Sequence, residues 1–133
     1  MRRITKCLLT VFLCMLLIQC TSEKERLNKV LNEMADNLNV STPLILNQNM
    51  QLDSAVVSAD NVFIYYYTII NAEKPVALMD SLEVELNSSI KKSFKIDERL
   101  RVFKENKVTI KYIYSDSTGS PVRTIKVTPE DYN

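Results

Sequence analysis

Apolar residues recur at helical spacing in three segments of the chain. In residues 23–38 they fall at i, i+3, i+4, i+7 and i+11, which is one face of a helix. Ser22 and Glu25 have the spacing of a capping box, and Pro43 prevents continuation. A second helix is predicted from Pro75, and a short third one over residues 97–105 with Asp97 as its cap. The stripe of the second helix consists of Leu78, Met79, Leu82, Leu86, Ile90 and Phe94.

Four other segments have the composition of β-strands: residues 50–58, 62–70, 107–115 and 122–128. The second of them is β-branched and aromatic on both faces, which predicts a central place in a sheet. The last two flank a turn that contains Gly119, the only glycine of the chain, where a hairpin needs positive φ. Residues 41–49 are predicted to be a loop, with Leu44, Ile45 and Leu46 as apolar plugs.

These elements predict an α+β fold in the order α-β-β-α-α-β-β, which is two hairpins separated by helices. Because hairpins need no crossover, we expect a mainly antiparallel four-stranded sheet. Helices on one face of that sheet would make a two-layer sandwich.

The N-terminus has the pattern of an export signal. Three cations precede an apolar run from Cys7 to Ile18, which is shorter than a membrane-spanning helix requires. The run ends in Leu17-Ile18-Gln19-Cys20, which resembles the lipobox of bacterial lipoproteins, although a small residue is usual where Gln19 stands. This resemblance implies a signal peptide over residues 1–19, a lipid on Cys20 and a single domain over residues 20–133. Ordinary signal-peptide cleavage and an uncleaved anchor remain alternatives.

Composition narrows the function. The chain has 133 residues, 25% of them charged, and no histidine. The absence of histidine excludes Ser-His-Asp and Cys-His catalysis and metal sites built on imidazole. Cleavage before Cys20 would lower the Lys and Arg count from 17 to 14 against 16 acidic residues, a balance of −2. Neither this balance nor any basic cluster indicates nucleic-acid binding, and no cofactor or metal is expected.

Two polar patterns were considered as candidate chemistry. Ser88 and Ser89 precede Lys91 and Lys92 at the S-x-x-K spacing of penicillin-binding enzymes, but no K-T-G element accompanies them. Asp80 and Glu83 share a helix face without an identifiable perturbing environment. Solvated helix surfaces are the simpler interpretation of both patterns.

Tyrosines are the candidate binding residues. Tyr65 and Tyr67 alternate along one predicted strand, and Tyr112 and Tyr114 along another. Their simplest role is packing between the sheet and the helices. Alternatively, Tyr65 and Tyr67 lie on a sheet face that no helix covers, where they would favour binding a protein or a glycan.

A set of residues spread over most of the mature chain forms a recognisable pattern: Leu52-Asp53-Ser54, Tyr65, Tyr67, Thr68, Asn71, Tyr112, Tyr114, Gly119, Val127, Pro129 and Asp131. In this pattern the chain resembles a family of small bacterial exported proteins of unknown function. Many members carry a cysteine pair near the second helix and the C-terminus, which this chain lacks. The resemblance implies export and a similar fold, and it brings no catalytic residues.

The sequence therefore favours a non-enzymatic lipoprotein of the bacterial cell envelope. We expect it to be anchored to a membrane through Cys20 and to bind a protein partner there, with an immunity or inhibitor protein as one version. The alternative is an accessory lipoprotein that binds a glycan or small ligand through the tyrosines. A hydrolase is disfavoured by the missing histidine and the single glycine.

Overall fold

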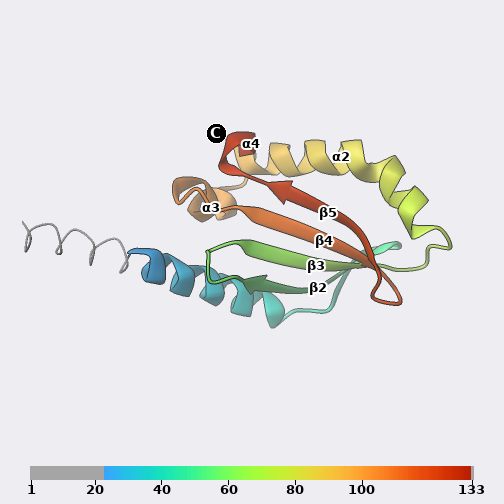
Figure 1. Cartoon of the computed structure of the whole chain (residues 1–133), viewed down its shortest axis with the longest axis horizontal. Coiled ribbons are helices and arrows are strands. Elements are labelled where there is room, and N and C mark those ends of the chain that lie inside the picture. The colour runs from blue at the N-terminus through green and yellow to red at the C-terminus, as the bar shows by residue number, and fades with distance from the viewer. Residues whose placement is uncertain (1–22, 133) are drawn as a thin grey trace, which may run out of the picture.

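An open five-stranded sheet forms the centre of the molecule, for which a computed structural model describes residues 23–132 (Figure 1). The strands lie in chain order: β1 (Leu44–Asn47), β2 (Met50–Val57), β3 (Phe63–Ile69), β4 (Ile110–Asp116) and β5 (Pro121–Val127). All neighbours are antiparallel except β3 and β4, which are parallel.

The helices pack on the sheet at two places. The N-terminal helix, described over residues 23–39, lies along β2, whereas α2 (Pro75–Ile96) lies along β5 (Figure 1). Two short turns of helix, η1 (Glu98–Leu100) and α3 (Arg101–Glu105), lead from α2 into β4, and α4 (Pro129–Tyr132) follows β5. Together α2, η1 and α3 make the crossover that a parallel strand pair requires.

The hydrophobic core lies on one face of the sheet. The register places Phe63 opposite Ile110 and Tyr67 opposite Tyr114, so these residues share a face. All buried strand residues of the core are on this face, together with buried side chains from the helices. The members contributed by helices are Leu31, Ala35, Met79, Phe94, Phe103 and Tyr132. The mixed α+β prediction, with helices against one face, is thus confirmed in outline.

The prediction of a four-stranded sheet is wrong. Residues 44–47, which were predicted to lie in a loop, form the fifth strand, β1, at the edge of the sheet. Its aliphatic side chains are exposed, so they are not plugs of the core. The expected order also lacks α4 and the parallel contact between β3 and β4. Local patterning identifies strands, but it does not report which strands become neighbours.

Other local predictions are confirmed. Pro75 occupies the first turn of α2, and the Asp97 side chain accepts a hydrogen bond from the Arg99 amide at the start of η1. Gly119 has φ +85°, in the left-handed region, within the β4–β5 hairpin. β3 is the middle strand of the sheet.

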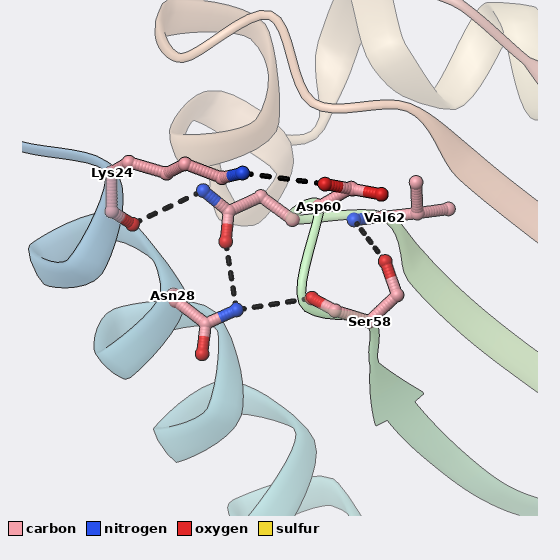
Figure 2. Close-up of polar contacts among 6 residues, drawn as sticks. Lys24, Asn28, Ser58, Asp60 and Val62 are labelled. Carbon is pink, nitrogen blue, oxygen red and sulfur yellow. Dashed lines mark hydrogen bonds and ion pairs between the residues drawn. The ribbon is translucent and has the colours of Figure 1, made fainter. Parts of the chain in front are cut away.

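A polar network fixes the start of the N-terminal helix to the turn between β2 and β3 (Figure 2). The Asn28 amide donates to the Ser58 carbonyl at 3.0 Å and to the Asn61 side chain at 2.8 Å. Asn61 is buried, has φ +59°, and donates to the Lys24 carbonyl at 3.2 Å. A surface ion pair between Lys24 and Asp60 closes the network at 3.2 Å. Asparagine tolerates the left-handed conformation that this turn requires.

The other end of the N-terminal helix is tied to the edge of β2. The Asn39 side-chain amide donates to the Ala55 carbonyl at 2.8 Å, and its oxygen accepts from the Ala55 amide at 2.7 Å. Strand β1 pairs with β2 only up to Leu52. The side chain of Asn39 therefore makes the two hydrogen bonds to the backbone of Ala55 that a residue of a neighbouring strand would make, at a position beyond the end of β1.

The predicted signal peptide and Cys20 lie outside the described residues. None of the helices in the described part of the chain is long and apolar enough to span a bilayer.

Candidate functional site

The four predicted tyrosines come together in one column on the face of the sheet that carries the helices. Tyr65 pairs with Tyr112 and Tyr67 with Tyr114 across the parallel strands. Their rings alternate between β3 and β4: Tyr65 and Tyr112 have centroids 5.2 Å apart, and Tyr67 and Tyr114 lie 5.0 Å apart. Both pairs are nearly parallel, at 10° and 18°.

Tyr65 and Tyr67 pack on the side of the sheet that carries the helices, as the simpler interpretation predicts, and the alternative of a face without helices is wrong. They pack against the core on the helix side, but the N-terminal helix and α2 lie over opposite edges of that face (Figure 1). Three of the four tyrosines are only half-buried, and Tyr114 is buried. The tyrosine column is therefore neither a fully packed core nor an open face.

The hydroxyls of the four tyrosines have no hydrogen-bond partner among the described residues. No hydrogen bond joins any of these four oxygens to another group within residues 23–132, and none of them is a fully buried polar atom. Because neighbouring rings stack, the column offers ring edges and hydroxyls, while the ring faces cover one another.

The apolar stripe of helix α2 is buried unevenly. Within residues 79–94 it is fully buried at Met79 and Phe94, at 0% and 1% exposure, whereas Leu86 and Ile90 pack against the core but are only half-buried. Between them Leu82, Leu86 and Ile90 remain half-buried and face the tyrosines. The middle of the helix thus presents apolar side chains to an unfilled space.

That space is a groove of about 330 Å³, which we call the tyrosine groove. Its floor is formed by Tyr67, Tyr112, Tyr114 and Met50. One wall is the half-buried stripe of α2 with Glu85 and Ser89, and the other is Leu46 and Asn47 of β1. A second hollow of about 280 Å³, lined by Tyr65, Met34, Leu38 and Asp97 among others, lies further along the same column. The volume of the tyrosine groove is at the lower limit for ligand pockets in proteins. A space of this size can receive a few side chains of a partner protein.

Burial is the main influence on the pKa values of the four tyrosine hydroxyls. It raises the pKa of Tyr67 to about 12 and also raises the pKa of Tyr65, Tyr112 and Tyr114. Each ionised phenol would also repel its stacked neighbours, as for Tyr112 beside Tyr65 and Tyr67. The hydroxyls therefore remain neutral near pH 7, able to donate and accept hydrogen bonds.

These shifts predict alkaline unfolding. A phenol whose pKa is raised in the fold contributes stability below its unfolded pKa of 10.0, and that stability is lost as pH rises toward 12. We expect the groove tyrosines to ionise together with loss of near-ultraviolet circular dichroism, measured in one titration of phenolate absorbance. Ionisation of all tyrosines near pH 10 in a chain that stays folded would contradict the burial of the column.

Two contacts hold α2 over the sheet and so define the groove. Near its first turns, Arg123 of β5 forms ion pairs with Asp80 and with Glu83, the latter at 2.9 Å. At the other end the Tyr132 ring stacks on Phe94, with centroids 4.7 Å apart, and its hydroxyl donates to the Val108 carbonyl at 2.7 Å.

The other polar candidates do not converge on a site. Asp80 and Glu83 are engaged by Arg123, and Lys91 forms an ion pair with Asp131 at 3.4 Å. Ser88 and Ser89 are exposed on α2. Residues 23–132 contain no group of three or more His, Cys, Asp or Glu side chains arranged to hold a metal ion.

Most polar residues of the resemblance motif have structural roles. Asp53 accepts hydrogen bonds from Gln51 and Thr68, and Asn71, with φ +54°, donates to the Gln48 carbonyl at 2.9 Å. Asp131 accepts from the amide and the hydroxyl of Thr128 at the start of α4. Of the motif, only Tyr67, Tyr112 and Tyr114 line the tyrosine groove.

Sequence reasoning missed two contributors to this site. Leu46 was assigned to a loop, and the middle of the α2 stripe was assigned entirely to the core. The sequence does contain a signal for the strand that holds Leu46. Asn47-Gln48-Asn49 is a turn-forming sequence between two apolar runs, which is the pattern of a β-hairpin. No sequence signal distinguishes a buried stripe from one that faces a groove.

Three solved structures share this fold. A candidate secreted protein from Pseudomonas aeruginosa is 19% identical, with a TM-score of 0.71, covering 83% of this chain and 96% of its own. EpsS, a pilotin of the Vibrio vulnificus type 2 secretion system, is 18% identical with a TM-score of 0.63, covering 84% and 97%. AspS, the type II secretion pilotin of Vibrio cholerae, is 18% identical with a TM-score of 0.59, also covering 84% and 97%.

No curated protein sequence matches this chain. A family model does match, over residues 25–122, which is most of the chain and includes the strands that carry the tyrosines. The chain belongs to the family described as Domain of unknown function (DUF8479).

Proposed function

We propose that this chain is a non-enzymatic lipoprotein of the bacterial envelope that binds an apolar segment of a partner protein in the tyrosine groove. Its anchor would be a lipid on Cys20, at the end of the lipobox-like sequence. Because helix residues begin by Glu23, the domain would be held close to the membrane.

The observation that carries this proposal is the half-buried middle of the α2 stripe. Leu82, Leu86 and Ile90 face the groove although other residues of the same stripe are buried. An amphipathic surface left unfilled beside polar hydroxyls is typical of a site that a partner completes. The partner would supply apolar side chains for α2 and backbone or side-chain polar groups for the tyrosine hydroxyls.

The shared fold gives this proposal its biological setting. Two of the proteins with this fold are pilotins of type II secretion systems. An accessory protein at the envelope also agrees with the signal-like N-terminus of this chain. We infer a comparable accessory role, with a partner that remains to be identified.

The ring geometry disfavours the glycan alternative. A sugar ring is bound by the flat face of an aromatic side chain, whereas the tyrosine rings here cover one another's faces. The non-enzymatic assignment is supported by the absence of histidine from the chain and by the neutral state of the groove hydroxyls.

Site-specific crosslinking in cells tests the proposal. A photo-reactive amino acid at Ile90 should capture one discrete envelope protein, to be identified by mass spectrometry, with the lipid checked by intact mass. The same group at Val84, which is on α2 but 82% exposed, should not. Leu86→Glu should abolish capture from Ile90, because a carboxylate in the apolar wall is costly to desolvate.

Purified components give the decisive comparison. The captured protein should bind the chain, and Leu86→Glu should weaken binding at least about tenfold, which is 1.4 kcal/mol. Val84→Glu, which adds the same charge to α2 at a residue that is 82% exposed, serves as the matched control. Equal capture from positions 84 and 90, or unchanged affinity of a folded Leu86→Glu chain, would refute binding in the groove.

A further inference from the structure

The edge of the sheet at β1 is apolar and carries no charge. Leu44, Ile45 and Leu46 are 43%, 65% and 50% exposed, and Val40, just before the strand, is 85% exposed. Asp36 and Asp53 are the nearest charged residues on either side, with sixteen uncharged residues between them. At the 25% charge of the whole chain, a segment of that length would contain about four charged residues.

An uncharged edge strand of this kind is unusual. The outer side of an edge strand has unpaired amide and carbonyl groups, which natural proteins shield with charges, proline, bulges, short strands or a covering element. β1 pairs only with β2 among the described elements, and none of its four residues is charged or proline, so its shortness and the register shift between Ile45 and Asn47 are its only shields. Its backbone and its side chains are therefore both suited to pairing with another strand.

The location of β1 indicates which kind of occupant it takes. β1 lies at the end of the molecule opposite the first described residues of the N-terminal helix (Figure 1). If Cys20 carries the anchor, as proposed above, this end faces away from the membrane. Antiparallel pairing of two copies through β1 would point their N-terminal ends in opposite directions, which one shared membrane does not allow. A lipid surface and a second copy are thus disfavoured, and a separate protein is favoured.

We propose that β1 is a strand-addition site that receives an extended, uncharged segment of a partner protein as the sixth strand of the sheet. Main-chain hydrogen bonds to β1 would provide affinity, and alternate side chains would contact the exposed aliphatic residues. The absence of charge selects for a segment that also lacks charge, because a charged side chain there would be desolvated without a partner. This site is separate from the tyrosine groove, although Leu46 borders both.

A pair of synthetic peptides tests this proposal on the full chain in lipid nanodiscs. The probe is a capped seven-residue peptide of alternating threonine and valine, and its twin has methyl groups on alternate backbone nitrogens. We expect the probe to slow amide hydrogen exchange of residues 44–46 about tenfold and saturably, and the twin to have no effect. Backbone methylation removes donors while it preserves the side chains, so it separates strand pairing from adsorption.

Variants locate the effect. Ile45→Lys should abolish the protection, because a lysine on the edge opposes strand pairing. Gln48→Lys places the same charge in the exposed turn beside the strand and should preserve it. Leu86→Glu should also preserve it, so that failure of the groove and failure of the edge are distinguishable.

Three results would overturn the proposal. Equal protection by both peptides would indicate simple apolar adsorption, and absence of saturable protection up to millimolar peptide would show that the edge does not accept strands. Protection that rises with protein concentration before peptide is added would assign the edge to a second copy of this chain.

Discussion

Tyr132→Ala is expected to lower the free energy of unfolding by about 3–5 kcal/mol, the cost of removing a large buried aromatic side chain. Tyr132 is 8% exposed, stacks on Phe94 at an angle of 9°, and donates its hydroxyl proton to the Val108 carbonyl. One side chain thus joins the end of α2 to the start of β4. Denaturant unfolding, followed by far-ultraviolet circular dichroism, measures the loss.

Tyr132→Phe is the matched control because it keeps the stacked ring. It removes only the hydroxyl, leaving the Val108 carbonyl without that donor, so we expect a cost of about 1 kcal/mol. Equal costs for the two variants would show that the ring contributes nothing. A cost below 1 kcal/mol for Tyr132→Ala would show that the C-terminal turn does not pack as described.

This residue also determines the shape of the tyrosine groove. The contact between Phe94 and Tyr132 fixes one end of α2, while Arg123 fixes its first turns through Asp80 and Glu83. Between these two points the helix spans the groove with its apolar side facing the tyrosines. A chain that loses either contact should therefore lose the position of the groove wall before it loses the sheet.

Periodic and locally capped elements could be predicted from the sequence. Four of the five apolar positions predicted between residues 27 and 38 lie on the core side of the N-terminal helix, whereas Val30 is 43% exposed, and alternation determines the buried side of β4. Capping was read correctly at Asp97 but missed at α4, although Thr128 and Asp131 have capping-box spacing and Pro129 follows Thr128. Helical periodicity, strand alternation and capping depend on residues within one short segment, so they can be predicted from the sequence alone.

Elements that depend on distant partners could not be predicted in the same way. β1 has three consecutive aliphatic residues and no alternation, so only its pairing with β2 identifies it as a strand. The parallel register of β3 and β4 is set by the crossover through α2. That register determines whether the two tyrosine pairs form one column. The tyrosines of the candidate site could therefore be predicted from the sequence, but their arrangement in space could not.

The position of the helices over the sheet was the other feature that could not be predicted from the sequence. The sequence allows two places for Tyr65 and Tyr67, packed under the helices or on a face without helices. The first assumes that helices cover the whole face of the sheet, and the second assumes that they cover none of it. In the structure the N-terminal helix and α2 lie over the two edges of that face (Figure 1), and the tyrosine groove lies between α2 and β1. The separation of two helices depends on the side chains that hold each one, which are Tyr132 and Arg123 for α2 and Asn39 for the N-terminal helix.

Asn39→Ala is expected to lower the free energy of unfolding by about 2–4 kcal/mol, since it leaves the amide and the carbonyl of Ala55 without partners, at about 1–3 kcal/mol each. Ala55 is 1% exposed, and no strand runs along the outer side of β2 at this position, so no other described group takes over. Asn39 is also the last described residue of the N-terminal helix before the connection to β1. Its loss should therefore release the β1 edge as well, which hydrogen exchange of residues 44–47 would report as faster exchange than in the unaltered chain.

Asn37→Ala provides the comparison, because Asn37 belongs to the same helix but is exposed. Alanine is the better helix former, so this change should alter stability by no more than about 0.5 kcal/mol. If both variants behaved alike, the paired hydrogen bonds of Asn39 would contribute no more than helix propensity does. A large loss confined to Asn39→Ala, with faster exchange at β1, would instead show that one amide side chain holds the helix, the edge strand and the β1 wall of the groove in place.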